Sequence, residues 1–310
     1  MRHAVLALFL SCVAPLSAQT PSQNTFRARL EQLPIMAIDS VALPLPIYPV
    51  LGRVSAVTAD DRGNLYILNR AADGDPVVVL DPDGRLLRSW GKGLFTMPHG
   101  IRIDPAGNVW TVDANTSKIY KFNAAGGLLL QMQLERPRED VEFCGATDVA
   151  FLPDGHVLVS DGYCNGRVVE LNPDGERVRE WGSRGREPGQ FRVAHSIALG
   201  PDQVVYVADR ENGRLQRFNR SGRLLGVWDY VSQLYSVTFS REGELYISLR
   251  LTDEPRNYIV RIDPATGEML GRVSLNCLGH ELAVSPGGAL LPGLLCPDSA
   301  GHVVLYRRRN

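Results

Sequence analysis

Short apolar runs separated by polar turns repeat along the chain from about residue 54 onward. Each unit has a short apolar strand, a polar turn that usually carries glycine, and a second apolar strand. The turns recur at intervals of roughly 40 to 48 residues, which is the spacing of propeller blades. The turn cores are Asp61–Asn64, Pro105–Asn108, Pro153–His156, Pro201–Gln203, Arg241–Glu244 and Pro286–Gly288.

Most units continue into a third strand and a second turn, as at Val77–Leu80 and Val168–Leu171. The pattern predicts an all-β fold, a six-bladed β-propeller over residues 41–310, and no helical period competes with it. The last unit ends at Val303–Tyr306, so we expect a strand near Val41–Ile47 to complete it and close the ring. In such a ring, the strand that enters each first turn lines the central channel.

The N-terminus has the pattern of an export signal. Arg2 precedes an apolar run, and small residues at Ser17-Ala18 suit cleavage, so residues 1–18 are interpreted as a signal peptide of a secreted or periplasmic protein. The run is too short for a stable membrane span. Cys12 lacks the small neighbours of a lipoprotein site. Residues 19–40 are polar and aperiodic, and we expect a flexible lead there.

Composition adds two constraints. The formal net charge of −1 leaves no electrostatic footprint for nucleic acid. Beyond the signal, an even number of cysteines in an exported protein favours disulfides over thiol chemistry. Three pairings are possible, and proximity along the chain favours pairing each cysteine with its sequence neighbour. The cysteines are Cys144, Cys164, Cys277 and Cys296.

Three histidines share one position in the repeat. His99, His195 and His280 each lie eight residues before a turn centre, in the second, fourth and sixth units. Alternate blades of a six-fold ring are about 120° apart, so these side chains should converge on the axis. Three imidazoles with a fourth position open are the ligand set of a catalytic zinc. The alternative is that each histidine is only a satisfied polar residue at a strand end.

A second shared position holds arginines. Arg70, Arg210 and Arg250 follow their turn centres by seven residues, and Tyr163 lies one residue further on in the third unit. Guanidinium groups beside an open metal position suit a carboxylate substrate. Nearby cations and a metal should favour the phenolate of Tyr163, as a catalytic base requires. Structural salt bridges are the alternative role for each arginine.

Carboxylates in the repeat have plainer interpretations. Asp113, Asp161 and Asp209 end corresponding strands, and we expect them to accept hydrogen bonds from backbone amides rather than to act in catalysis. Glu281 directly follows a candidate ligand. Glu281 could bind a cation or contact a metal ligand. The alternative is that it is a solvent-facing residue of a strand.

Four segments closely resemble the peptidyl-α-hydroxyglycine α-amidating lyases, a family of six-bladed NHL-repeat propellers. The resemblance runs from about Val54 to Tyr306, and its specific motifs are Ser160–Asn165 (SDGYCN) and Val207–Arg214 (VADRENGR). It also rests on Phe143–Ala150 and on the stretch from Pro188–Phe191 to His195.

The resemblance implies roles for matching positions. Zinc would be held by the three histidines, Tyr163 would be the catalytic base, Arg70 a catalytic arginine, and Arg210 part of the cavity wall. The reaction would cleave a C-terminal α-hydroxyglycine into a peptide amide and glyoxylate. A structural calcium would be bound by the backbone carbonyls of Val57 and Ile101 and the side chain of Glu281. One disulfide of the family matches Cys144–Cys164.

The chain also departs from the family pattern. The second family disulfide falls on Tyr206 and Arg217, and the calcium aspartate is Glu281 here. A cavity methionine is Leu278, and Arg250 has no clear counterpart. The chain has no room for the copper monooxygenase that makes the substrate, so a separate monooxygenase, or a different α-hydroxy acid conjugate as substrate, is expected.

Two other functions compete with a lyase. The first is a non-catalytic extracytoplasmic propeller that binds a peptide or a sugar, which should contain no stoichiometric zinc. The second is a calcium-dependent hydrolase of the six-bladed lactonase type. That chemistry needs axial Glu, Asn and Asp, where this chain places His, Ser, Thr and Tyr.

Overall fold

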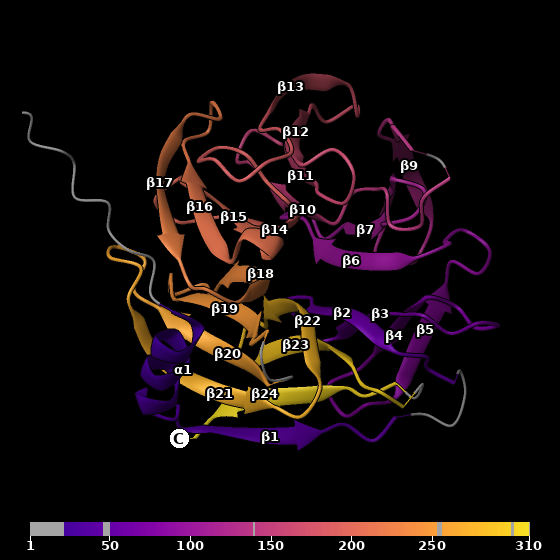
Figure 1. Ribbon diagram of the computed structural model, residues 1–310. Helices are drawn as coiled ribbons and strands as arrows, with labels where there is room; N and C mark the ends of the chain where they lie inside the picture. Colours follow the sequence, from indigo (N-terminus) through magenta and orange to yellow (C-terminus); the bar gives the residue numbers. More distant parts are fainter. Residues whose placement is uncertain (1–21, 46–49, 139, 253–255, 299–300, 310) are drawn as a thin grey trace, which may run out of the picture.

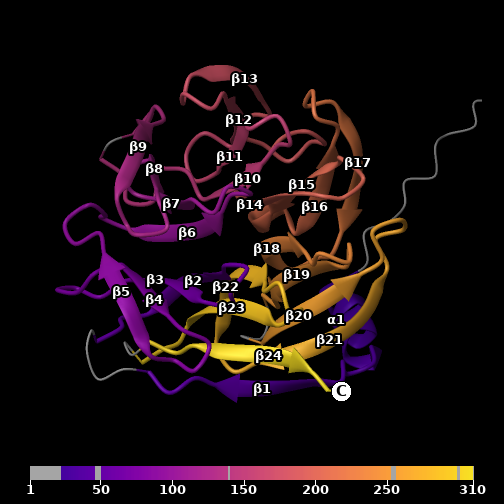
Figure 2. The ribbon, with the colours of Figure 1, turned by 180° about the vertical axis from the view of Figure 1, so that it is seen from behind.

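Six four-stranded antiparallel sheets surround a central axis in the computed structural model, which makes the chain a six-bladed β-propeller (Figure 1). The same ring is visible from behind in Figure 2. The structure describes residues 22–45, 50–138, 140–252, 256–298 and 301–309. The predicted signal peptide, residues 1–18, and Cys12 lie outside this part. The predicted propeller is confirmed.

Five blades are contiguous in the sequence, and each runs outward from its first strand. Blade one is β2 (Val54–Ala59), β3 (Leu65–Asn69), β4 (Val77–Leu80) and β5 (Leu86–Trp90); blade two is β6 (Pro98–Ile103), β7 (Val109–Asp113), β8 (Lys118–Phe122) and β9 (Leu128–Gln133); blade three is β10 (Asp148–Phe151), β11 (Val157–Asp161), β12 (Arg167–Leu171) and β13 (Arg177–Trp181). Blade four is β14 (Ala194–Leu199), β15 (Val205–Asp209), β16 (Arg214–Phe218) and β17 (Leu224–Asp229), with the 3₁₀ turn η1 (Arg210–Asn212) between β15 and β16; blade five is β18 (Gln233–Phe239), β19 (Leu245–Arg250), β20 (Asn257–Ile262) and β21 (Met269–Leu275).

The sixth blade joins the two ends of the chain. Strands β22 (Leu278–Val284), β23 (Leu290–Leu295) and β24 (Val304–Arg308) are completed by β1 (Ile38–Ala42), which pairs antiparallel with β24. The N-terminal closing strand was predicted, but it begins and ends earlier than the expected Val41–Ile47. Pro44 explains the earlier end, because proline cannot donate to a ladder of backbone hydrogen bonds.

The expected flexible lead over residues 19–40 is wrong for much of its described part, which contains the helix α1 (Gln23–Gln32). The side chain of Ser22 accepts a hydrogen bond from the amide of Thr25 and caps the helix. Phe26 and Leu30 are buried against blades four and five. Two apolar residues are too few to reveal a helical period, and docking on the propeller supplies the stability that a short isolated helix lacks.

Substituting Leu30 tests whether α1 is part of the cooperative domain. Leu30 is fully buried, so Leu30→Ala should lower the free energy of unfolding by about 2–5 kcal/mol. Leu225 is 44% exposed, and Leu225→Ala should change it by less than about 0.5 kcal/mol. Urea unfolding of both variants gives the comparison. Equal stability of the two variants would mean that α1 unfolds separately.

A left-handed residue occupies the same place in the first turn of every blade. Five blades use glycine there, with φ between 79° and 84°, whereas blade four uses Gln203 with φ 62°. Glycine adopts this conformation without a steric penalty from Cβ. Because the turn geometry is shared, the innermost strands have a common register. Residues at the same number of positions from the turn therefore occupy equivalent places in their blades. The five glycines are Gly63, Gly107, Gly155, Gly243 and Gly288.

The hydrophobic core lies between neighbouring blades. One cluster joins blades one and two, and another joins blades three and four. Tryptophans at outer strands extend this packing: Trp90 lies against the turn of the next blade, where a Cβ at Gly126 would be 2.8 Å from the indole. Close inter-blade packing keeps the innermost strands of adjacent blades at fixed positions around the channel.

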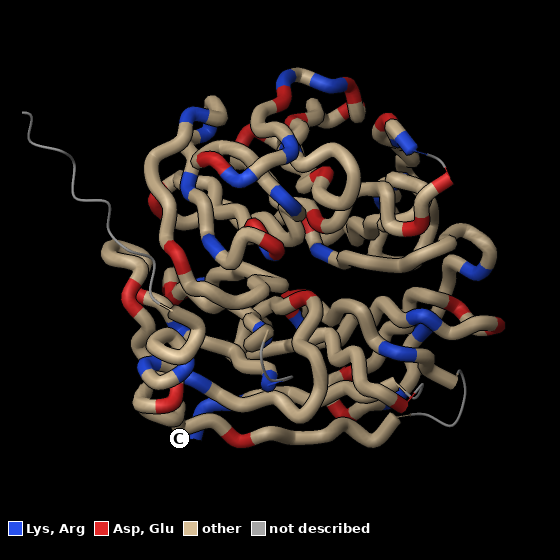
Figure 3. The backbone as a smooth tube through the Cα atoms, in the orientation of Figure 1, with Lys and Arg blue, Asp and Glu red and all other residues tan. Residues whose placement is uncertain are grey.

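Acidic and basic residues are interspersed over all six blades (Figure 3), in keeping with the near-zero net charge. Among the described residues, we find no helix with the length and apolar character needed to cross a bilayer. Both disulfides link sequence neighbours, as predicted, and such pairs are typical of extracellular proteins. They are Cys144–Cys164 and Cys277–Cys296.

Candidate metal centre and active site

His99, His195 and His280 meet at the channel axis. They come from β6, β14 and β22, the innermost strands of alternate blades. Their ring centroids are 4.4 to 4.9 Å apart, and one nitrogen of each lies within 4.8 Å of the others. All three are buried. The convergence expected from the repeat is therefore present.

Bulges in the innermost strands place these side chains. In β6 the pairing with β7 skips His99, and in β14 the pairing with β15 skips His195. In β22 the irregularity includes His280 and Glu281. A bulged residue leaves the regular alternation of the ladder, which re-aims its side chain. Here the side chains turn toward the axis at one end of the channel.

Backbone carbonyls of the other three blades orient the imidazoles. The Nδ1 atoms of His99, His195 and His280 lie 2.7, 2.5 and 3.0 Å from the carbonyl oxygens of the intervening blades. A carbonyl only accepts, so each Nδ1 donates, and each Nε2 of the neutral ring keeps its lone pair. Such outer partners fix the tautomer and orientation of metal-binding histidines. The carbonyls belong to Thr147, Tyr235 and Ser55.

The electrostatics of the cluster suit a cation. Burial, together with nearby arginine charges, lowers the pKa of each histidine well below its usual value. The rings are therefore neutral, as metal binding requires. The Nε2 of His195 is buried without a hydrogen-bond partner among the described residues. Three neutral imidazoles with an orphaned lone pair fit a zinc-type ligand set.

Tyr163 lies at the edge of the histidine cluster. Its hydroxyl is 3.0 Å from Nε2 of His99 and accepts a hydrogen bond of 3.3 Å from Arg210. The guanidinium of Arg210 also lies over the rings of Tyr163 and Tyr235, 5.4 and 5.1 Å from their centroids. The disulfide at Cys164 holds the loop that carries the phenol. A phenol, a cation and three imidazoles thus share one small site.

The phenol does not ionise readily without a metal. Burial raises the pKa of Tyr163 above its usual value, and the hydrogen bond and charge of Arg210 together with the charge of Arg70 only partly oppose this. The arginine charges alone do not offset burial, so the expectation that cations and a metal together favour the phenolate stays a prediction. A further positive charge beside the hydroxyl is needed to bring its pKa toward neutral pH.

The three arginines of the second register have different surroundings. The Nε of Arg70 donates to the carbonyl of Pro98, 3.1 Å away and next to His99. Arg210 pairs with Glu211 at 2.9 Å while reaching Tyr163. Arg250 ends β19 opposite Gln233 and has no hydrogen bond or ion pair with the cluster in the described residues. Arg70 and Arg210 thus belong to the site.

A charged layer of the channel, formed by Arg102, Asp148 and Glu281, was not found by counting residues from the turns. Arg102, three residues after His99, bridges the carboxylates of Asp148 and Glu281 at 2.6 and 3.1 Å. The Oε1 of Glu281 lies 3.4 Å from Nδ1 of His195. The sequence did contain an indication of this layer, because charged residues within otherwise apolar inner strands are unusual.

Two of the three aspartates at the strand ends accept hydrogen bonds from backbone amides as expected, whereas Asp161 accepts from the side chains of Asn165 and Arg167 instead. Asp113 accepts from the amides of Thr96 and Met97 at 2.6 and 2.7 Å, in the connection that leads to His99. Asp209 likewise accepts from the amide of Arg192 at 3.0 Å, ahead of His195. These carboxylates hold the chain that delivers the histidines to the axis.

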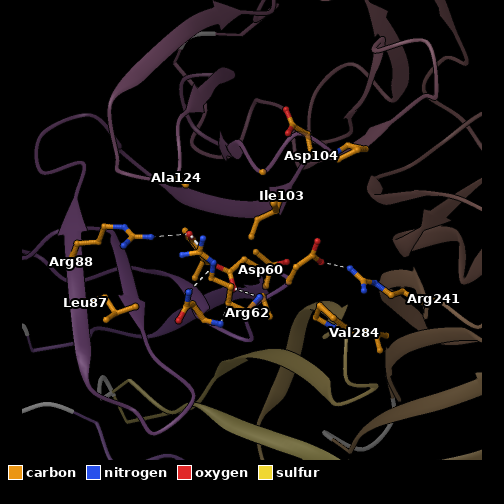
Figure 4. Close-up of a pocket in the computed structure, with 17 residues that line it drawn as sticks. Asp60, Arg62, Leu87, Arg88, Ile103, Asp104, Ala124, Arg241 and Val284 are labelled. Carbon is orange, nitrogen blue, oxygen red and sulfur yellow. Dashed lines mark hydrogen bonds and ion pairs between the residues drawn. The ribbon is translucent and has the colours of Figure 1, made fainter.

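Two cavities lie near the channel ends. One of about 520 Å³ is lined by Arg70, Phe95, Met97, Phe143 and Pro98, the residue before His99, among others. A larger one, of about 810 Å³, lies at the opposite mouth among the first turns (Figure 4). Of its charged residues, Asp60 and Asp104 accept hydrogen bonds within the turns, and Arg241 pairs with Asp61. The smaller cavity is therefore the candidate substrate site.

Comparisons with known sequences agree with the repeat. The NHL repeat model matches residues 143–171 and 191–218. The chain is 37% identical to the peptidylglycine alpha-amidating monooxygenase of Rattus norvegicus over 229 residues, covering 63% of this chain and 23% of that protein. It is 32% identical to peptidyl-alpha-hydroxyglycine alpha-amidating lyase 1 of Drosophila melanogaster over 255 residues, covering 71% of this chain and 46% of that protein. The chain thus spans less than half of either relative.

Solved structures show the fold. A streptogramin B lyase superposes with a TM-score of 0.63, covering 88% of this chain and 98% of that one, at 16% sequence identity. At that identity the likeness concerns architecture alone. Taken with the sequence relatives and the repeat match, the chain belongs to the NHL-repeat β-propellers of the peptidyl-α-hydroxyglycine α-amidating lyase family.

Proposed function

We propose that this protein is a zinc-dependent carbon–nitrogen lyase that cleaves a peptidyl-α-hydroxyglycine, or a similar α-hydroxy acid conjugate, into an amide and glyoxylate. One observation carries the proposal. The hydroxyl of Tyr163 lies between Nε2 of His99 and the guanidinium of Arg210, at the edge of three converging imidazoles. A base, a cation for a carboxylate and a metal ligand set are thereby within reach of one small molecule.

The substrate groups match the site. The terminal carboxylate of an α-hydroxyglycine suits Arg70 and Arg210, whose guanidinium groups can form paired hydrogen bonds with its oxygens. The peptide part suits the cavity of about 520 Å³ beside Arg70. Phe95, Met97 and Phe143 give that cavity an apolar wall for the preceding side chain.

The residues then move one proton. The phenolate of Tyr163 takes the proton of the substrate hydroxyl, the C–O bond becomes the carbonyl of glyoxylate, and the C–N bond breaks. The proton ends on the nitrogen of the released amide, so no oxidant or reductant is consumed. Arg210, hydrogen-bonded to the phenol, stabilises its ionised form during this transfer.

Zinc would be held by His99, His195 and His280 through their Nε2 atoms, because each Nδ1 is used by a backbone carbonyl. When bound, the ion supplies Lewis acidity toward the substrate hydroxyl and a charge that lowers the pKa of the adjacent phenol. The buried carbonyl partners keep the three rings in place whether or not substrate is present.

The cellular setting follows from the chemistry. An α-hydroxyglycine arises by hydroxylation of a C-terminal glycine, so a separate monooxygenase would supply the substrate. We propose that both act outside the cytoplasm, because the two disulfides suit an oxidising compartment and the N-terminal pattern suits export.

The test is glyoxylate release from a synthetic peptide that ends in α-hydroxyglycine, measured together with the zinc content of the purified protein. We expect one zinc per chain and glyoxylate release above the uncatalysed rate. The same peptide with its carboxylate amidated should react far more slowly, because Arg70 and Arg210 lose their partner. Stoichiometric zinc without release would refute this substrate, and absence of zinc would favour a binding propeller.

A further inference from the structure

We propose that Arg102 supplies a permanent cation in the channel, at the place where the family resemblance implies a bound calcium. The protein would then need no divalent ion there. The inference concerns the layer beneath the histidines and is independent of the substrate proposed above.

Both Nη atoms of the Arg102 guanidinium donate hydrogen bonds to channel groups. Its Nη2 lies 2.6 Å from Oδ2 of Asp148 and 3.1 Å from Oε2 of Glu281, and its Nη1 donates to the carbonyl of Leu282 at 3.0 Å. The side chain of Arg102 is 13% exposed, and the two carboxylates are buried. These ligands come from blades three and six, and Arg102 itself comes from blade two.

The register identifies this place with the expected calcium site. Leu282 follows His280 by two residues, as Ile101 follows His99 and Val57 follows Ser55. The carbonyl that Arg102 uses is therefore the sixth-blade equivalent of the two carbonyls expected to bind calcium. The third expected ligand, Glu281, is itself a partner of Arg102. A guanidinium thus takes both kinds of ligand that calcium would require.

Calcium does not fit while Arg102 stays in place. Calcium binds six to eight oxygens at about 2.3–2.6 Å, and it would have to displace the guanidinium from its ligands. The remaining hydroxyls are also committed: Ser196 donates to Asp148 at 2.8 Å and Ser236 to Glu281 at 3.1 Å. The layer is a hydrogen-bonded network with its own cation, in which Oε2 of Glu281 is engaged while its Oε1 has no hydrogen-bond partner among the described residues.

The network also supports the metal centre above it. Glu281 lies 3.4 Å from Nδ1 of His195 and 3.9 Å from Nδ1 of His99, so its position near the ligands depends on what holds its other oxygen. Arg102 does this with a covalently attached charge. Calcium removal should therefore leave the channel of the natural protein intact.

The first experiment uses the natural chain. After purification without chelator, metal analysis should find less than about 0.1 calcium per chain, and 1 mM CaCl₂ should not raise the melting temperature relative to a calcium-selective chelator, EGTA. One calcium per chain, or a melting temperature that falls with EGTA, would overturn the proposal.

The second experiment removes the built-in cation. Arg102→Met leaves Asp148 and Glu281 facing an apolar side chain, so the variant should acquire one calcium and a calcium-dependent rise in melting temperature of roughly 5 °C or more. Arg102→Lys keeps the charge and should not respond. Arg214→Met is the matched control, because Arg214 also bridges a buried carboxylate, Asp209 at 2.8 Å, and backbone carbonyls.

The outcomes separate clearly. If Arg102→Met folds only when calcium is added during refolding, the proposal is supported. If it responds to calcium no more than Arg214→Met does, the layer is not a cation site and the proposal fails. Neither result depends on glyoxylate release, so the lyase assignment is tested separately.

Discussion

Replacing His195 with alanine is expected to empty the metal centre and reduce glyoxylate release on the order of 10³-fold or more. His195 is buried, its Nδ1 is held by the carbonyl of Tyr235, and its Nε2 has no partner among the described residues. Removing it leaves two imidazoles, which hold zinc poorly. Zinc content and the turnover rate are the two measurements.

A control histidine separates metal loss from general damage. His302 is partly exposed and pairs with Asp298 at 3.0 Å, away from the channel axis. His302→Ala removes the same ring and should keep both zinc and activity. If His195→Ala retains one zinc per chain and full activity, the three histidines are not the metal ligands.

Replacing Tyr163 with phenylalanine is expected to reduce the turnover number by about 10²–10⁴-fold while zinc stays bound. The phenylalanine keeps the ring that packs against His99, with centroids 5.5 Å apart, and loses only the hydroxyl. The histidine ligands are untouched, so zinc content should match that of the natural chain. Loss of activity with metal retained would identify the phenol as the base rather than a ligand.

Tyr120→Phe is the matched control for this change. Tyr120 is buried and donates to the carbonyl of Leu94 at 2.6 Å, apart from the histidines. This variant should lose some stability but keep its turnover number. Full activity of Tyr163→Phe would show that another group removes the substrate proton.

Much of the site was predictable because the fold repeats. Turn residues recur at blade spacing, so counting back from the turn places His99, His195 and His280 at equivalent positions, and six-fold geometry brings them together. The same counting located Arg70 and Arg210. It also selected Arg250, which lies at the end of β19 and makes no hydrogen bond with the histidine cluster in the described part of the chain. The position of a residue in the repeat predicts its place in a blade, but it does not predict the direction of a long side chain.

Other features depend on contacts between blades. The carbonyls of Ser55, Thr147 and Tyr235 became partners of the histidines only once bulges had turned these positions toward the axis. The ion pairs of Arg102 connect blades two and three with blade six, which is distant from them in the sequence. The helix α1 has too few apolar residues to be recognised without the surface on which it docks.

By itself, the sequence determined the number of blades, the closure of the ring by its two ends and the three histidines that share a register, and it favoured the neighbouring disulfide pairs. These are local or periodic properties, so they can be recognised from the order of residues along the chain. Only the tertiary structure decided which nitrogen of each histidine faces the axis, how burial sets the pKa of Tyr163, and that Arg102 fills the layer beneath. Those outcomes depend on desolvation and on distances between blades, which exist only after the ring has closed.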